Sequence, residues 1–224
     1  MSLIDTFFNA AVLRQTWPLL LSGLWITLLL GFTSILCGMS LGLGVALWRL
    51  YAPRWLAAVA IAYIDVFRSI PLLVLLIVIY YALPFVGIRL SPFAAAATAL
   101  SLVSCAYAAE IFRAGIEAIG RGQFEAARAL GLHWWPMMRL VVLPQAMRLV
   151  VPPMTGNCIN VIKDTALASV VAMPDLLKQA TQAQALAANP TPLIGAAILY
   201  IAFLLPLVRL VGYLERRMGA GQGA

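Results

Sequence analysis

Five apolar runs, separated by shorter polar segments, dominate the pattern of hydrophobic and polar residues along the chain. The first, residues 15–48, contains no charged residue. Because a helix needs roughly 20 apolar residues to cross a bilayer, this run is typical of one long, tilted span. We therefore predict an all-α integral membrane protein with one transmembrane domain over 1–224. Its five spans are expected at approximately 17–48, 56–84, 93–113, 148–172 and 193–213.

Prolines and polar stretches modify this simple pattern. The second span is interrupted by Pro71, and the pair Pro152 and Pro153 should kink the fourth. Residues 1–14 are mildly amphipathic and predict a short helix at the membrane surface. Residues 173–192 are polar and helix-prone, and predict a surface helix and loop between the last two spans. We expect the glycine-rich C-terminal tail to be disordered.

The longest polar segment, residues 114–147, separates the third and fourth spans and predicts two short helices. Residues 123–130 are rich in good helix formers and are followed by Gly131, which suits a left-handed helix end. A second helix is expected over 136–144, with Pro136 in its first turn. Such a segment is either a docking element for another protein or an amphipathic loop lying on the membrane surface.

The helix expected at residues 123–130 has two different sides. Phe124, Ala127 and Leu130 recur at helical spacing and form a small apolar stripe. Glu125 and Arg128 lie three residues apart on the polar side and can pair. One side can therefore pack on the protein while the other meets a partner.

Composition and charge place the protein in a bilayer. The 224 residues are 63% hydrophobic and 10% charged, more apolar surface than a soluble domain of this size can bury. Ten of the 15 Lys and Arg residues lie on one side of the predicted topology, which the positive-inside rule makes cytoplasmic. The N-terminus is then outside and the C-terminus inside. The net charge of +7 thus reports orientation, and we expect no nucleic-acid partner.

Several polar residues fall at membrane depth, where they are costly and seldom idle. Some pair along a helix, and others follow the double proline of the fourth span. For Asp65 and Arg68, a pair that only reaches toward water and a functional role remain open. For the residues of the fourth span, contact with a small solute and a structural bond between helices remain open. These candidates are Asp65, Arg68, Glu110, Arg113, Asn157, Asn160, Lys163 and Asp164; Glu110 and Arg113 are expected to brace the polar segment that follows them.

No metal or catalytic centre is predicted. The three cysteines lie apart in apolar runs, and the single histidine, His133, has no cysteine or second histidine near it. The chain also has no phosphate-binding loop ending in Gly-Lys-Ser or Gly-Lys-Thr. We therefore expect neither an enzyme nor an ATPase.

Four motifs in order resemble one family. The polar segment contains Glu-Ala-Ala at 125–127, Gly131 and Leu-Pro at 143–144, and so resembles the EAA loop of permease subunits of bacterial ABC importers. YIDVFRSIPLLV at 63–74, AYAAEIFRAGIEAIGRGQ at 106–123 and the series LPQA, PP, N and KDT resemble the polar amino-acid subfamily. Departures from the usual pattern are Ser69, Ile70, Leu75 and Ala166.

This resemblance implies a type I ABC importer permease of the bacterial inner membrane that moves a polar amino acid or a related small solute. Its partners would be an ABC ATPase dimer, a periplasmic solute-binding protein and a second permease, either the same chain or a sister. ATP and Mg would be bound by the ATPase and no cofactor by this chain. The EAA loop would form the helix that couples the permease to the ATPase through Gln123, Glu125, Ala126, Ala127 and Gly131.

Two other classes of membrane protein compete with the permease. A secondary, ion-coupled transporter would need coupling carboxylates and often inverted repeats, whereas the chain offers few carboxylates and no visible symmetry. An intramembrane enzyme would need a nucleophile with a base or a metal cluster. Uptake that requires ATP would distinguish the permease from a secondary transporter. Catalytic turnover by the purified chain alone would indicate an intramembrane enzyme.

Overall fold

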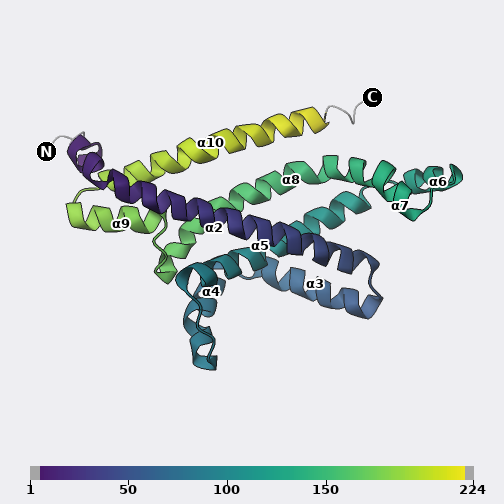
Figure 1. Ribbon diagram of the computed structural model, residues 1–224, viewed down its shortest axis with the longest axis horizontal. Coiled ribbons are helices and arrows are strands. Elements are labelled where there is room, and N and C mark those ends of the chain that lie inside the picture. Colours follow the sequence, from purple (N-terminus) through teal and green to yellow (C-terminus); the bar gives the residue numbers. More distant parts are fainter. Residues whose placement is uncertain (1–5, 220–224) are drawn as a thin grey trace.

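The computed structural model describes residues 6–219, and every regular element within them is helical (Figure 1). The expected disorder of the last five residues, and the first five of the expected N-terminal surface helix, lie outside this range. The α-helices are α2 (Ala10–Tyr51), α3 (Arg54–Ser69), α4 (Leu72–Ile77), α5 (Pro92–Glu117), α6 (Arg121–Ala129), α7 (Trp134–Met137), α8 (Leu143–Asp164), α9 (Leu176–Ala187) and α10 (Thr191–Gly219). Two π turns, η1 (Val78–Ala82) and η3 (Met138–Val142), and two 3-10 segments, η2 (Leu83–Val86) and η4 (Thr165–Val171), complete the list.

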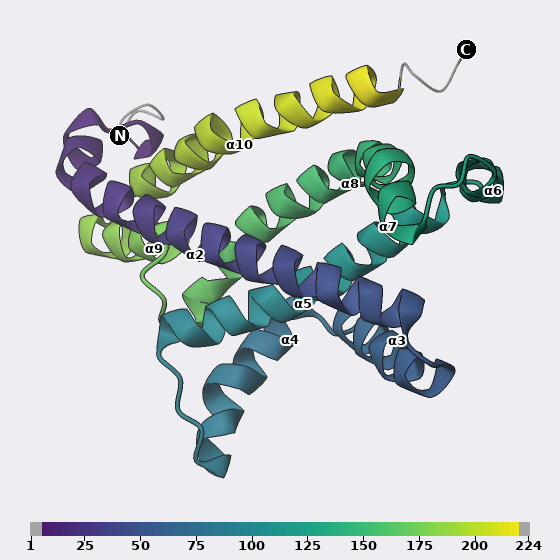
Figure 2. The same cartoon turned by 45° about the vertical axis from the view of Figure 1, so that its right-hand side comes forward.

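The long helices α2, α5, α8 and α10 run along the length of the molecule, and α4 points away from the side of the bundle (Figures 1 and 2). Helix α6 projects at one end, and α9 packs beside the start of α2 at the other. Among the described residues, three helices or parts of helices are long and apolar enough to cross a membrane: α2, α5 and Thr191–Tyr213. The bent pair Arg54–Ser69 and Leu72–Val86 makes a fourth if it is one broken span.

Helix α2 is longer than its predicted span because it absorbs part of the expected surface helix. The side chain of Asn9 caps it, and its Oδ1 accepts hydrogen bonds from the N–H groups of Ala11 and Val12 at 3.0 and 3.2 Å. The 42 residues of α2 rise about 63 Å, roughly twice the thickness of a hydrocarbon core. Residues 10–14 are therefore no separate surface helix, because the cap starts one continuous helix ahead of them.

The second predicted span is bent by 100° between α3 and α4. Ile70 adopts an extended conformation, with φ −76° and ψ 130°, directly before Pro71. A proline disfavours helical geometry in the residue before it and lacks the N–H that a helix would need. Pro71 thus produces the expected break, and α4 leaves the bundle at a steep angle (Figure 2).

Each of the two π turns ends directly before a leucine-proline pair, at Ala82 before Leu83-Pro84 and at Val142 before Leu143-Pro144. The N–H of Leu83, before Pro84, donates to the carbonyl of Val78, and the N–H of Leu143, before Pro144, donates to that of Met138. A hydrogen bond between residues five apart shifts the hydrogen-bond pattern of the helix by one position. The proline, which has no N–H, therefore interrupts no hydrogen bond of the helix.

The helix expected over 136–144 is consequently wrong at both ends. It begins at Trp134 and runs through the π turn into α8 without stopping at Pro144. Helix α8 also continues across Pro152 and Pro153, and gives way to 3-10 geometry only after Asp164. The fourth predicted span is therefore an α-helix followed by a 3-10 segment, with the change of geometry at the Lys163 and Asp164 pair.

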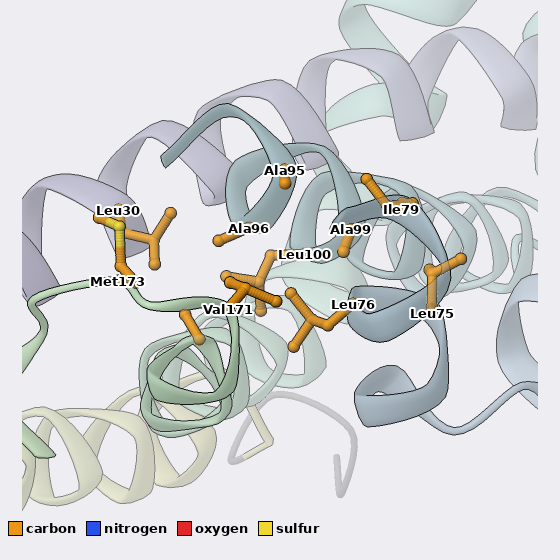
Figure 3. Packing of buried hydrophobic residues seen from close by; sticks show 11 residues of the cluster. Leu30, Leu75, Leu76, Ile79, Ala95, Ala96, Ala99, Leu100, Val171 and Met173 are labelled. Atoms are coloured by element: carbon orange, nitrogen blue, oxygen red, sulfur yellow. The ribbon is translucent and has the colours of Figure 1, made fainter. Parts of the chain in front are cut away.

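The largest buried cluster of the described residues joins five elements near the bend, α2, α4, η1, α5 and η4 (Figure 3). It brings together Leu30 of α2, Leu76 of α4, Leu100 of α5 and Val171 of η4. Leu75, one of the departures from the usual permease pattern, belongs to this cluster and is 7% exposed. Its apolar side chain therefore contributes to the core that fixes the bend.

Glycines let α2 and α5 approach closely. A Cβ on Gly42 would lie 2.7 Å from the Cβ of Ala108 and 2.9 Å from the carbonyl oxygen of Cys105, closer than such atoms can come. Gly38 faces Ser104 in the same way. Small residues at such positions allow helix backbones to pack in a membrane without a hydrophobic driving force.

We expect Gly42→Ala to destabilise the protein by about 1–3 kcal/mol, because one added methyl group must push two packed backbones apart. Gly44→Ala is the matched control, since nothing lies within 4 Å of its would-be Cβ. Thermal unfolding in detergent compares the two. Equal melting temperatures for both variants would show that the helices separate without cost.

Asp175 caps α9 from a fully buried position, 0% exposed. Its carboxylate accepts hydrogen bonds from the N–H groups of Leu177 and Lys178 at 3.3 and 3.2 Å. The N–H of Leu176 donates to Thr27 Oγ1 at 3.0 Å and ties the start of α9 to α2. Burial raises the pKa of Asp175 to about 6, although the two backbone hydrogen bonds act in the opposite direction.

An acid whose folded-state pKa is raised takes up a proton on folding, so its charge costs stability at neutral pH. We expect Asp175→Asn, which keeps a good cap, to be more stable than the parent by about 2–3 kcal/mol at pH 7.5. The difference should narrow as the pH falls below about 6 and close near pH 4, where the unfolded aspartate also becomes neutral. Thermal unfolding across this pH range measures it, and a difference that is independent of pH would contradict the burial argument.

Candidate functional sites

The predicted helix in the polar segment is present as α6 and ends in a Schellman motif. Gly131 has φ +75°, a conformation that favours glycine. Its N–H donates to the carbonyl of Arg128 at 2.9 Å, and the N–H of Leu132 donates to that of Ala127 at 3.1 Å. These two bonds define the exit of α6 and depend on the backbone of Gly131.

One face of α6 rests on a small apolar platform. Ala127 is 3% exposed and packs with Met137, Met138 and Val142, while Phe124 lies partly buried beside them. Two of the three residues of the predicted apolar stripe, Phe124 and Ala127, therefore pack against the protein. Leu130 is instead 82% exposed, because the helix ends there and its side chain turns away from the platform.

The other residues predicted for the coupling site are exposed. They are Gln123, Glu125, Ala126 and Gly131. Within residues 6–219 no ion pair joins Glu125 to Arg128, so the expected pairing is absent there. Gln123 accepts a 3.3 Å hydrogen bond from Gln145 of α8, which fixes the start of the helix. The site is a rigid helix with a polar outer face and one exposed leucine at its end.

A charged network braces the end of α5 just before this helix. Arg49 Nη1 of α2 donates to Glu110 Oε2 at 2.8 Å, and Arg113 Nε donates to the same oxygen at 3.2 Å. Arg113 also pairs with Glu117. The side chains of Arg49, Glu110 and Arg113 are only 20–23% exposed. The network therefore ties α2 to α5, and Arg49 is a member that was not among the predicted residues.

Four of the predicted intramembrane residues line one pocket of about 260 Å³. Asn157, Asn160, Lys163 and Asp164 come from α8, and the facing wall comes from α4 and α5. Lys163 and Asp164 are adjacent on the helix, so their side chains point about 100° apart. They nevertheless line the same pocket.

The facing wall contains residues that sequence reasoning missed. Ser104 accepts a 3.4 Å hydrogen bond from Asn157, and Tyr107 and Leu72 complete that side. Ser104 and Tyr107 are three apart on α5 and so share a helix face, but a hydroxyl in an apolar run gives little signal. Leu72 is positioned only by the bend at Pro71.

Asp65 and Arg68 lie on α3, outside the pocket lining, and both are exposed. No ion pair joins them within residues 6–219. The guanidinium carbon of Arg68 instead lies 5.3 Å from the centroid of the Tyr107 ring, within cation–π range. Arg68 therefore contacts a residue that lines the pocket, whereas Asp65 is not in the lining.

Known proteins with similar sequences cover nearly the whole chain. The probable glutamine ABC transporter permease protein GlnM of Bacillus subtilis (strain 168) is 34% identical over 94% of this chain and 98% of its own. The arginine transport system permease protein ArtQ of the same organism is 38% identical, over 90% and 93%. The glutamate/aspartate import permease protein GltK of Escherichia coli O6:H1 is 38% identical, over 94% and 98%.

Solved structures agree in fold, and a family match follows. A crystal structure of an amino acid ABC transporter with histidines matches with a TM-score of 0.85 and 38% identity, over 92% of this chain and 96% of the other. An inward-facing MetNI methionine ABC transporter matches with 0.75 and 25%, over 92% and 98%. Residues 34–220 match the family described as binding-protein-dependent transport system inner membrane component. With a helical bundle, an exposed α6 and this match over most of its length, the chain belongs to the family of inner-membrane components of binding-protein-dependent transport systems.

Proposed function

We propose that the chain couples ATP hydrolysis by a partner ATPase to the import of a polar amino acid. The observation that carries this proposal is the geometry of α6, which is fixed at both ends and projects from the bundle with exposed residues (Figure 1). A short, preformed helix with one exposed apolar anchor suits insertion into a groove of another protein. The anchor is Leu130, and Gln123, Glu125, Ala126, Ala127 and Gly131 set the position of the helix around it.

In this assembly an ATPase dimer binds ATP and Mg and meets α6 at the cytoplasmic side. A solute-binding protein delivers the solute at the opposite end, and a second permease copy or a sister permease completes the route. We assign five spans to the chain by adding α8, with η4, to the three long helices and the bent pair. The N-terminus is then outside and the C-terminus cytoplasmic, in line with the basic residues around α6.

The solute class rests on the relatives, whose names specify glutamine, arginine, and glutamate or aspartate. The pocket between α5 and α8 is the place on this chain where such a solute would be held. In alternating access, movement of α6 with the ATPase would open the spans on one side and then on the other. The bracing network at Glu110 would transmit that movement to α2 and α5.

The test is purification of the tagged chain from its native membranes in mild detergent, with identification of proteins that co-elute in stoichiometric amount. We expect an ATPase subunit to co-elute with the parent and to be lost with Leu130→Glu. Leu186→Glu is the matched control, because Leu186 is 86% exposed on α9 at the opposite end of the molecule. A second permease band would decide between a heterodimer and a homodimer.

Other results of the same experiment would contradict the proposal. A chain that elutes alone and moves solute into vesicles without ATP would revive the ion-coupled transporter. No comparison with known proteins favours that class. Loss of the ATPase with both glutamate variants would mean that the added charge, not its place on α6, disrupts the assembly.

A further inference from the structure

The structure points to a substrate class for the pocket between α5 and α8, an inference that rests on the proposed function. We infer that the pocket takes a zwitterionic amino acid whose side chain has no net charge. Its walls differ in chemistry: the charged and amide groups all come from α8, and the facing wall is apolar apart from two hydroxyl groups. Its volume of about 260 Å³ suits one small solute.

The α8 wall is suited to the common part of an amino acid. Lys163 offers an ammonium group to an α-carboxylate, and Asp164 offers a carboxylate to an α-ammonium. Asn157 and Asn160 add amide donors and acceptors one helical turn away. One cation and one anion match a zwitterion, with no charge left over on either side.

The facing wall is suited to a side chain without charge. Leu72 of α4 and Leu100 and Val103 of α5 supply apolar surface, and Ser104 and Tyr107 supply hydroxyl groups. Hydroxyls can satisfy an amide or hydroxyl side chain but cannot neutralise an ion. A charged side chain held against this wall would remain unpaired at membrane depth, where charge is costly.

Arg68 is a further cation close to this wall. It lies on the Tyr107 ring at 5.3 Å and does not line the pocket. A solute with an acidic side chain would have to displace this contact to reach the guanidinium. The test therefore includes an acidic solute, which would reveal any such role for Arg68.

The experiment measures equilibrium binding to the purified native complex, without its binding protein, for two pairs of nearly isosteric probes. L-Glutamine and L-glutamate differ by one charge, and so do L-norleucine and L-lysine. We expect glutamine and norleucine to bind at least about tenfold more tightly than their charged counterparts. Asp164→Asn should weaken both neutral probes by about tenfold or more, because it removes the partner of the α-ammonium group.

A designed change of preference guards against loss of folding. Val103→Asp should make lysine bind more tightly than norleucine. Val103→Asn, which introduces a side chain of the same shape as aspartate but without its charge, should not. Tighter binding of glutamate or lysine to the parent, or no saturable binding of any probe to a complex that transports, would overturn the inference and leave the proposed function intact. Absence of an ATPase or of ATP-driven uptake would instead refute the proposed function, whatever the order of binding.

Discussion

Gly131→Pro should leave the protein inserted in the membrane and reduce ATP-driven uptake by on the order of 100-fold. Proline cannot adopt the φ of +75° found at this position, and it removes the N–H that donates to Arg128. The exit of α6 must then change, although the spans on either side keep their own packing. Uptake of radiolabelled amino acid into proteoliposomes that contain the complete transporter measures the loss.

A graded series separates the backbone from the side chain. No atom lies within 4 Å of a Cβ at Gly131, so a substitution there acts through its conformation and not through a clash. Asparagine, which tolerates a left-handed conformation, should retain most of the uptake, and valine should lose most of it. Gly122→Ala is the positional control, since Gly122 also faces open space and has no positive φ. Normal uptake by an inserted proline variant would remove the helix exit from the coupling mechanism.

The features that could be predicted from the sequence are those that local chemistry determines. The break at Pro71 and the glycine exit of α6 follow from backbone constraints that hold in any surroundings. The long apolar runs likewise predict helices that can cross a membrane, which α2, α5 and Thr191–Tyr213 provide. The predicted helix ends were wrong where adjacent segments of the chain determine them. Pro144 stops no helix because a π turn precedes it, and Asn9 starts α2 earlier than hydropathy alone suggests.

The candidate sites divide in the same way. Four of the eight intramembrane candidates line the pocket, because residues close together on α8 remain close in space. The opposite wall depends on how α4 and α5 pack against α8, and no local pattern marks Leu72 or Tyr107 as its neighbours. Glu110 and Arg113 were expected as a local pair. Their link to Arg49, which is distant in sequence, required the packing of α2 on α5.

Glu110→Gln should destabilise the protein by about 2–3 kcal/mol, because it leaves two arginines facing each other without a shared counter-charge. The upper values for fully buried pairs do not apply, since these side chains are 20–23% exposed. Ion pairs of Arg113 with both Glu110 and Glu117 mean that part of the network remains in the variant. Thermal unfolding of the purified protein measures the effect, and Glu117→Gln, at a side chain that is 52% exposed, is the control with a much smaller expected loss.

The coupling between Arg49 and Glu110 distinguishes a brace from two separate surface charges. In a double-mutant cycle, Arg49→Gln and Glu110→Gln together should cost less than the sum of the single changes, by about 1 kcal/mol or more. If the network also transmits movement from α6, the Arg49 variant should lower uptake more than it lowers ATP hydrolysis, since α2 would lose its connection to the end of α5. Additive losses in the cycle would mean that the 2.8 Å contact contributes no stability of its own. Equal losses of uptake and hydrolysis would indicate that Arg49 acts in assembly, because a failed assembly lowers both activities. A loosened network would instead uncouple uptake from hydrolysis.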